Sequence, residues 1–342
     1  MTVLLSLSSV NKSFAGQKIL KDLSLQVKEH ELVAVLGSSG SGKTTLLRLI
    51  SGFDSPESGE IEILGSKVFA KNVFVPAEKR RVGFVPQDAA LFPHLSVAGN
   101  IEFSLGDLNT AERQKRVQEL LALVDMVGFE DRLPHQLSGG QRHRVALARA
   151  LAPKPDLILL DEPFSSLDAE LRARLREDVK KVLLTTGTTA ILVTHDQEEA
   201  LSIATRVAIL REGTIAQIGL PKDIYQAPTD VEMATFLGDS VIIEGTVKNG
   251  KIDTQLGQLS PLNQVAEGSK GRVAIRPENF YLQPNPKGEG EVIGRTYFGH
   301  DALIEVKLPG VVIQARANGP FAPEMGMRVT VWVRGQVNFY TN

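Results

Sequence analysis

The sequence predicts an α/β domain with a mostly parallel sheet, followed by a small all-β domain. Through roughly residue 235, short aliphatic runs alternate with segments of helical periodicity, a pattern typical of parallel strands joined by helices. From residue 241 onward the chain shows β-like runs broken by glycine and proline, which is typical of a small OB-like barrel or sandwich. The length of 342 residues agrees with two or three domains.

Composition restricts the class of protein. The chain is 42% hydrophobic and 23% charged with a formal net charge of −2, so it has the composition of a soluble globular protein and no overall basic field for nucleic acid. The lack of cysteine excludes disulfides and thiolate metal sites and suits the cytoplasm. No stretch approaches the roughly 18 apolar residues that cross a membrane. The start, residues 1–7, lacks the basic region of a secretory signal, and we expect it to begin the first strand.

A glycine-rich loop lies between a predicted strand, 32–36, and a predicted helix, 44–50. Residues 37–44 match the pattern G-x-x-x-x-G-K-[ST], in which backbone N–H groups and a helix N-terminus surround phosphate oxygens. Lys43 can reach the β- and γ-phosphates, and the Thr44 hydroxyl can ligate Mg²⁺. A glycine turn that binds nothing would not need the flanking strand and helix. We therefore predict a nucleoside-triphosphate site formed by Gly37, Ser38, Ser39, Gly40, Ser41, Gly42, Lys43, Thr44 and Thr45.

Polar side chains end two further predicted strands. Asp161 and Glu162 follow an aliphatic run, and the C-terminal edge of a parallel sheet is where ligands bind. Asp161 suits a Mg²⁺ shell, and Glu162 suits a base that orients water. His195 follows the run 188–193; a lone histidine is more often structural, but this one lies at the same edge. Asp196 and Glu199 then form a start resembling a capping box for the next helix.

Two other segments carry polar or glycine residues where elements begin or end. Gln87 ends the predicted strand 81–86 with an amide. Residues 138–141, Ser-Gly-Gly-Gln, precede a helix with an apolar face, and Ser138 is a natural N-cap. The two glycines at this N-terminus form a second possible anion site, although the residues alone favour an ordinary capped helix. Phe14 lies in a turn-rich stretch and could stack on a purine, but the residues alone favour core packing.

The remaining predicted elements follow from periodicity and turn signals. A helix is expected from Thr110, as its N-cap, to Gly128, with apolar residues at helical spacing. A last helical piece covers 232–237. The other expected strands are 4–10, 23–27, 61–65, 241–247, 272–276, 291–297, 302–308, 311–315 and 328–333.

Taken together and in this order, the motifs resemble those of the ATP-binding-cassette ATPases. The resemblance covers residues 1 to about 235 and is specific because several separate segments match. It overrides the plainer interpretations of the glycine-started helix and of His195. The matching segments are 37–44 (Walker A), Gln87 (Q-loop), 137–141 (the signature sequence LSGGQ), 157–162 (Walker B, with Glu162 in the place of the catalytic glutamate), 166–168 (D-loop, containing Asp168) and His195 (switch histidine).

The resemblance implies a P-loop NTPase cassette over 1–238, with a helical subdomain at about 88–150. In this family two cassettes pair head to tail and sandwich two ATP molecules, so Ser138, Gly139, Gly140 and Gln141 would contact the ATP of a partner chain. The resemblance also implies that Glu162 orients the attacking water and His195 contacts the γ-phosphate. It further implies that Phe14 stacks on adenine, and that Mg²⁺ is held by Thr44, Gln87 and Asp161.

The β domain, 239–342, contains the segment 274–279 and resembles the C-terminal accessory domain of importer ATPases of the maltose, sulfate, polyamine and ferric-iron types. Similarity over 137–179 and 224–240 points to the ferric-iron branch; import of another solute is the alternative. The resemblance implies a homodimer at the cytoplasmic face of the inner membrane. Its partners would be permease subunits, received by the segment between Gln87 and the signature, and indirectly a periplasmic solute-binding protein.

A non-transport cassette ATPase acting on DNA or the ribosome is the alternative class. DNA-repair members carry a very long coiled coil inside the cassette, and the segment between Gln87 and Leu137 leaves no room for one. Ribosome-acting members usually carry two cassettes in one chain. Nucleic-acid binding by the β domain is disfavoured by the acidic balance and by the lack of interleaved aromatic and basic runs. We expect a dimerising or regulatory module there, and no nucleic-acid partner.

Overall fold

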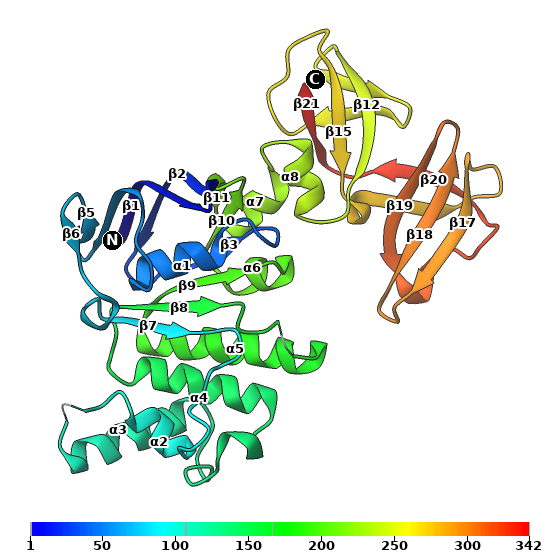
Figure 1. The fold of residues 1–342 in the computed structure, drawn as a ribbon. Coiled ribbons are helices and arrows are strands. Elements are labelled where there is room, and N and C mark those ends of the chain that lie inside the picture. Colours follow the sequence, from blue (N-terminus) through cyan, green and yellow to red (C-terminus); the bar gives the residue numbers. More distant parts are fainter. Residues whose placement is uncertain (1, 107, 166, 342) are drawn as a thin grey trace. The chain divides into compact units, whose positions relative to one another are not determined.

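Residues 2–106, 108–165 and 167–341 are described by the computed structural model, which divides into two units, Met1–Lys222 and Asp223–Asn342 (Figure 1). The second unit begins before the predicted domain boundary at 238/239 because it includes most of α7 (Pro221–Gln226) and all of α8 (Val231–Phe236). Arg276 explains this grouping, since its Nη1 donates to the carbonyls of Ala234 and Gly238, both at 2.8 Å. The predicted boundary instead follows the change from helices to strands.

A six-stranded sheet in the order β11-β10-β3-β9-β8-β7 forms the centre of the first unit. Neighbours from β10 to β7 are parallel, and only β11 at the edge is antiparallel to its neighbour. Every residue of β3, β8 and β9 is buried, as expected for parallel strands covered on both faces. The strands are β3 (Leu32–Leu36), β7 (Val82–Val85), β8 (Leu157–Asp161), β9 (Thr189–Thr194), β10 (Arg206–Arg211) and β11 (Thr214–Gly219).

Helices connect these strands and form a subdomain beside β7 (Figure 1). Helix α1 packs on β7, β8 and β9, whereas α2, α3 and α4 pack on one another, and α4 reaches β7. The helices are α1 (Lys43–Ser51), α2 (Val97–Glu102), α3 (Thr110–Leu123), α4 (Gly139–Leu151), α5 (Ala169–Thr186) and α6 (Gln197–Ile203). The predicted helical subdomain is therefore present in the described residues as α2, α3 and α4.

The predicted start of α3 needs correction, whereas the predicted N-cap of α6 is confirmed. Asn109, not Thr110, is the N-cap of α3: its side chain accepts from the Glu112 N–H at 3.0 Å, and Glu112 returns a bond to the Asn109 N–H. The helix ends at Leu123, ahead of the predicted stop at Gly128. At α6, Asp196 caps the Glu199 N–H at 3.1 Å as predicted.

The other half of the α6 capping box is absent from the described contacts, because Glu199 accepts instead from the Thr194 hydroxyl. Burial raises the pKa of the Glu199 carboxyl, and the Thr194 bond opposes this. The hydroxyl therefore gives the buried carboxylate its partner.

A five-stranded antiparallel sheet, in the order β2-β1-β4-β5-β6, packs over the first unit's core. Its strands β1 and β2 run longer than the predicted runs 4–10 and 23–27, and the short strands β5 and β6 were not predicted. The bounds are β1 (Val3–Phe14), β2 (Gln17–Lys28), β4 (Ser58–Ile63), β5 (Ser66–Ala70) and β6 (Val73–Phe74).

The second unit is all-β after α8, as predicted, and contains both a barrel and a sheet. The closed barrel β12-β13-β14-β21-β15 and the five-stranded sheet β16-β20-β17-β18-β19 share one hydrophobic core. The barrel strands are β12 (Val241–Lys248), β13 (Lys251–Thr254), β14 (Gly257–Pro261), β15 (Lys270–Ile275) and β21 (Gln336–Thr341). The sheet strands are β16 (Phe280–Pro284), β17 (Gly290–Tyr297), β18 (Asp301–Leu308), β19 (Val311–Asn318) and β20 (Arg328–Val333).

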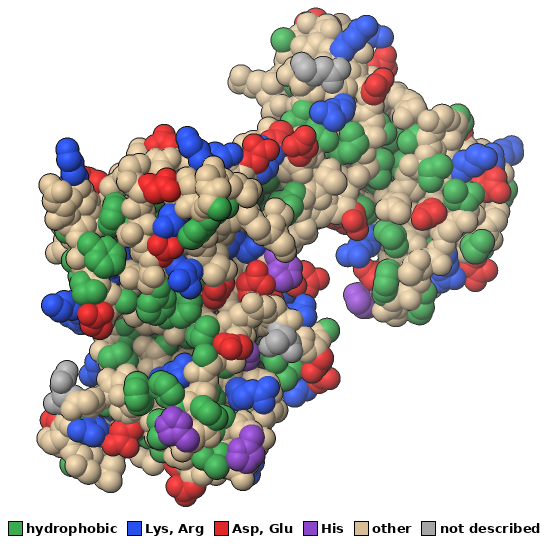
Figure 2. Space-filling view, viewed as in Figure 1, with side chains coloured by type: hydrophobic (Ala, Val, Ile, Leu, Met, Phe, Trp, Pro, Cys, Tyr) green, Lys and Arg blue, Asp and Glu red, His purple; other side chains and the backbone are tan. Residues whose placement is uncertain are grey.

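The surface carries charges of both signs. On the face shown in Figure 2, Lys and Arg side chains are interspersed with Asp and Glu, in keeping with the net charge of −2. Within the described ranges, no helix is long and apolar enough to cross a membrane.

Candidate functional site

The glycine-rich loop connects β3 to α1 at the C-terminal edge of the central sheet. The Gly37 N–H donates to the Thr194 carbonyl at 3.3 Å, which fixes the start of the loop to the end of β9. Gly40 (φ 79°) and Gly42 (φ 105°) have left-handed backbone that glycine adopts without steric cost, and Gly42 is the N-cap of α1. Residues 38–40 are exposed, so the N–H groups of the loop and the helix N-terminus are placed where an anion can bind.

Lys43, the first residue of α1, folds back over the loop. Its Nζ donates to the carbonyls of Gly37 at 2.9 Å and Ser38 at 3.0 Å, and lies 3.7 Å from a Glu162 carboxylate oxygen. Burial lowers the pKa of this ammonium, whereas Glu162 and Asp161 raise it. A buried cation therefore lies beside the glycine-rich loop, hydrogen-bonded to two neutral carbonyl groups that phosphate oxygens could replace.

Asp161 and Thr44 meet across the gap between β8 and α1. The Thr44 hydroxyl donates to Asp161 Oδ1 at 3.2 Å. Burial raises the pKa of the Asp161 carboxyl; the Thr44 bond lowers it, Glu162 raises it and Lys43 lowers it. A hydroxyl and a buried carboxylate at this spacing form a hard-oxygen pair, which is the donor chemistry that Mg²⁺ prefers. The residues present thus fit the predicted metal.

Glu162 and His195 also come together, although 33 residues separate them in the sequence. His195 Nδ1 lies 2.9 Å from Glu162 Oε2, and because a carboxylate only accepts, this nitrogen carries the hydrogen. Glu162 has φ 42°, an unusual backbone for a residue other than glycine, and its N–H donates to the Val193 carbonyl at 3.0 Å. The backbone bond to β9 therefore fixes the position of Glu162, and the contact with His195 orients its carboxylate.

Gln87 is connected to the same edge through Ser165, a residue that the sequence did not single out. Gln87 Nε2 donates to Ser165 Oγ at 3.0 Å, and that hydroxyl donates to the Glu162 carbonyl at 2.9 Å. The only signal for Ser165 was its position three residues after Glu162. The structure thus brings Gln87 and Glu162 into one network.

The segment 138–141 begins α4 and lies apart from the phosphate-type loop. Ser138 is the N-cap, as predicted: its Oγ accepts from the Gln141 N–H at 3.3 Å, and Gln141 Oε1 accepts from the Ser138 N–H at 2.9 Å. Among the described residues, no hydrogen bond or ion pair joins this segment to residues 37–45. The capping box uses the N–H groups of Ser138 and Gln141, so among the described residues of this segment the N–H groups of Gly139 and Gly140 are the ones that a ligand could bind.

The two glycines of this segment also have a packing reason. A Cβ at Gly139 would lie 2.9 Å from Leu167 Cδ2, and one at Gly140 would lie 2.9 Å from Leu171 Cδ1. Asp168, between these leucines, caps α5 by accepting from the Leu171 N–H at 2.9 Å. Ser166, the first residue of the predicted D-loop, lies outside the described residues.

Phe14 is at the surface rather than in the core. Its side chain is 46% exposed at the end of β1, and Lys12 Nζ lies 4.9 Å from the ring centroid. The core interpretation favoured by the residues alone is therefore wrong. The stretch was misjudged because β1 runs on past the buried strand, to a position where a side chain faces solvent.

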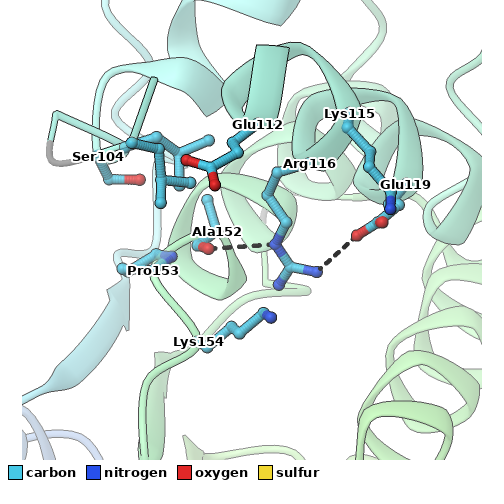
Figure 3. A pocket seen from close by; sticks show the side chains of 10 residues that line it. Ser104, Glu112, Lys115, Arg116, Glu119, Ala152, Pro153 and Lys154 are labelled. Carbon is cyan, nitrogen blue, oxygen red and sulfur yellow. Dashed lines mark hydrogen bonds and ion pairs between the residues drawn. The ribbon is translucent and has the colours of Figure 1, made fainter. Parts of the chain in front are cut away.

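A separate pocket of about 430 Å³ lies between α3 and the residues that follow α4 (Figure 3). Arg116 extends into it, and its guanidinium donates to the carbonyls of Ala152 at 3.2 Å and Leu151 at 2.9 Å. These bonds give hydrogen-bond partners to backbone carbonyl groups at the C-terminal end of α4, which have no partner within the helix. Glu112, Lys115 and Glu119 supply further charges of both signs, and the sequence had indicated none of these residues.

Comparisons with known protein families match both units. A model described as ABC transporter matches residues 20–165, and one described as TOBE domain matches residues 273–338. The protein named Fe(3+) ions import ATP-binding protein FbpC 1 of Rhodococcus jostii (strain RHA1) is 44% identical over 348 residues, covering 99% of each chain. The Fe(3+) ions import ATP-binding protein FbpC of Serratia marcescens is 40% identical over 345 residues, covering 98% of this chain and 99% of its own.

Two solved structures resemble the first part of the chain. The cbiO1 protein of Clostridium perfringens, described as part of the transporter complex cbiONQ, superposes with a TM-score of 0.60 at 28% identity, covering 66% of this chain and 91% of its own. An ATP-binding cassette solved as a dimer in a post-hydrolysis state with ADP and Pi superposes with a TM-score of 0.56 at 35% identity, covering 64% of this chain and 99% of its own.

Proposed function

Because this chain belongs to the ABC transporter family as one of its ATP-binding subunits, we propose that it is the ATP-hydrolysing motor of a ferric-iron importer. One observation carries the motor assignment. Lys43, Glu162 and His195, which follow three different strands of the parallel sheet, meet within hydrogen-bond or ion-pair distance at its C-terminal edge. That edge is where such sheets bind ligands.

The residues at this edge have complementary roles toward ATP. The N–H groups of residues 37–45 and the α1 dipole surround the phosphates, and Lys43 exchanges its loop carbonyls for phosphate oxygens. Glu162 orients the attacking water as a general base, and His195 holds that carboxylate while its exposed ring faces the γ-phosphate. Phe14, exposed beside Lys12, offers a face for adenine.

Mg²⁺ would be held by the Thr44 hydroxyl, the Asp161 carboxylate and the Gln87 amide oxygen. When bound, the ion neutralises charge on the β- and γ-phosphate oxygens. Asp161 is buried and its pKa is raised by that burial, so a cation beside it would favour the ionised carboxylate that a ligand must be. Ser165 orients the Gln87 amide from the other side.

Two copies of the chain pair head to tail, so that residues 138–141 complete the ATP site of the partner. The support is that Ser138 is exposed at the N-terminus of α4, where the helix dipole and the N–H groups of Gly139 and Gly140, which the capping box does not use, attract phosphate. Asp168 holds the adjoining helix α5 at this surface. The similar cassette that was solved as a dimer fits this arrangement.

The permease would dock on the segment between Gln87 and the signature, and hold the motor at the cytoplasmic face of the inner membrane. Phe92 and Phe103 form an aromatic pair there, with ring centroids 4.3 Å apart, and Phe103 is 63% exposed. Ferric iron as cargo, delivered by a periplasmic binding protein, rests on the names of relatives that match nearly the whole chain.

Transport by the reconstituted system tests both parts of the proposal. The chain, its permease and its binding protein are placed in liposomes, and ATP-driven uptake of ferric iron is compared with uptake of sulfate, polyamine and maltose. Iron uptake supports the proposal. Uptake of another solute alone would refute the iron assignment, but it would leave the assignment as a transport ATPase in place.

Lys43→Ala is expected to abolish hydrolysis and uptake, because no other side chain of the loop supplies a cation. The matched control is Lys67→Ala, which removes an exposed lysine paired with Glu60 at 2.8 Å and is expected to leave both activities near normal. Normal hydrolysis by the Lys43 variant would remove the central claim.

A further inference from the structure

The segment immediately after Gln87 has an unusual backbone. Ala89 (φ 61°) and Ala90 (φ 40°) are consecutive residues in the left-handed region, which L-residues other than glycine, asparagine and aspartate rarely enter. Such a conformation persists only where surrounding contacts over-determine it. Because neither position is a glycine, the surroundings have to hold the turn in place.

Arg149 supplies that hold from the last turn of α4. Its Nη1 donates to the Ala90 carbonyl at 2.8 Å and its Nη2 donates to the Ala89 carbonyl at 3.1 Å. The guanidinium carbon also lies 5.3 Å from the centroid of the Phe92 ring. The planar guanidinium of arginine thus donates to the carbonyls of both left-handed residues at once, a geometry that a lysine ammonium does not reproduce.

Asn100, a fully buried residue of α2, fixes the other end of the same segment. Its Oδ1 accepts from the Phe92 N–H at 2.8 Å, and its Nδ2 donates to the Phe92 carbonyl at 3.1 Å. Residues 89–92 are therefore held by side chains of two helices, α4 and α2. On the N-terminal side of this segment lies Gln87, whose side chain donates to Ser165 Oγ.

We infer that Arg149 is a positioning residue for the ATPase reaction, which sets the direction of the Gln87 amide through the backbone of Ala89 and Ala90. The inference rests on the proposed function, because it assumes that Gln87 acts at the nucleotide. Among the described contacts, the Arg149 side chain has none with Glu162 or with residues 37–45. Its effect on turnover passes through Gln87, and substituting it misplaces one ligand while the phosphate-binding loop stays intact.

The variant Arg149→Lys is tested in the full chain by two measurements. Hydrogen exchange of the backbone amides in a peptide covering residues 86–95 is expected to speed up about tenfold or more, because the guanidinium that over-determines the turn is lost. In steady-state hydrolysis, kcat is expected to fall about tenfold, within the range that a small misplacement of a reacting group produces, while KM for ATP stays within about twofold.

A double-mutant cycle separates positioning from general damage. In a Gln87→Ala background, Arg149→Lys is expected to cause no further loss of kcat, because residues that act as a unit are not additive. Independent, multiplying losses would overturn the inference. The control is Arg144→Lys on the same helix, which loosens the contact with Asp178 and is expected to leave exchange in 86–95 and kcat unchanged.

Unchanged exchange and an unchanged kcat in Arg149→Lys would also refute the positioning role, and so would an equal loss in Arg144→Lys. Each of these results leaves ATP hydrolysis by the parent chain in place. Failure of the parent chain itself to hydrolyse ATP would instead contradict the proposed function, so the two failures are distinguishable.

Discussion

The Lys43 ammonium and the Glu162 carboxylate lie 3.7 Å apart, although they follow β3 and β8, which are separated in the sheet by β9. His195, at the end of β9, lies 2.9 Å from the second carboxylate oxygen of Glu162. Both oxygens of Glu162 are therefore engaged within the chain. If phosphate binds at Lys43 as we propose, it would replace this ion pair and leave Glu162 with His195 as its partner.

The first prediction follows from this relationship. Glu162→Gln keeps the shape and the left-handed backbone of the residue but removes the proposed base and the negative charge beside Lys43. We expect ATP to bind at least as well, because the cation is free for phosphate, while hydrolysis falls about 10²-fold or more, the usual contribution of a general base. The ATP-loaded variant should accumulate as a dimer, measured by light scattering on a sizing column.

Two controls define this experiment. Glu170→Gln changes an exposed glutamate of α5 that pairs with Arg174 at 2.6 Å, and it should leave hydrolysis and association as in the parent chain. A strictly monomeric Glu162→Gln protein with ATP bound would contradict the head-to-tail pairing. Residual hydrolysis close to that of the parent would remove Glu162 from the role of base.

Strand periodicity predicted most of the candidate site, for a physical reason. Asp161, Glu162 and His195 follow fully buried aliphatic runs, and the C-terminal ends of parallel strands meet at one edge, so their proximity follows once the runs are recognised. The bond between Gln87 and Ser165, and the bonds from Arg149 to the carbonyls of residues 89 and 90, could not be predicted in this way. Both depend on contacts between segments far apart in the chain, 78 residues apart for Gln87 and Ser165.

The fold was predictable to a similar extent. Apolar runs predicted β3, β7, β8 and β9 of the central sheet, whereas β10 and β11 were not predicted. In the second unit, β13, β14 and β21 of the barrel and β16 of the sheet were missed because these short strands carry few apolar residues each. Closure of the barrel also joins distant segments, with Ser260 of β14 opposite Gln336 of β21 in parallel. At α3, Asn109 and Thr110 are both plausible caps, and only the reciprocal bond with Glu112 decides between them.

A second prediction concerns the glycines that begin α4. In Gly140→Ala the new methyl would lie 2.9 Å from Leu171 Cδ1. The leucine has to shift, and because its side chain is flexible and only half-buried we expect a loss of no more than about 1 kcal/mol in the free energy of unfolding. Adding Leu171→Ala removes the obstructing side chain. The double variant should therefore be less destabilised than the sum of the single variants, measured by urea unfolding.

The same pair of variants separates packing from phosphate binding as the reason for the glycine. If packing is the whole reason, the double variant also recovers ATP hydrolysis. Additive losses of stability would show that the leucine does not obstruct the methyl. Ala146→Gly, on the same helix, serves as a control. It is expected to lose about 2 kcal/mol through helix propensity and a buried methyl, and Leu171→Ala should not offset that loss.

The second unit contains two tyrosines with raised pKa values. Burial is the largest cause for both, and it raises the pKa of each from 10.0 to about 12. The Tyr225 hydroxyl donates to Glu278 Oε1 at 2.6 Å, which adds to its shift, and the Tyr340 hydroxyl donates to the Pro228 carbonyl at 3.0 Å. Both bonds need the protonated phenol. The first joins α7 to the turn at residues 277–279, and the second joins β21 to the segment between α7 and α8.

The last prediction is the pH dependence that follows. Because the folded unit keeps these protons to about pH 12 and the unfolded chain releases them near 10.0, their contribution to stability is complete below pH 10.0 and is lost as the pH rises toward about 12. Urea unfolding followed at several pH values should show this loss, and Tyr225→Phe with Tyr340→Phe should flatten it. Tyr297→Phe, at a side chain that is 56% exposed, is the control. An equally steep loss in the double variant would assign the alkaline transition to other groups.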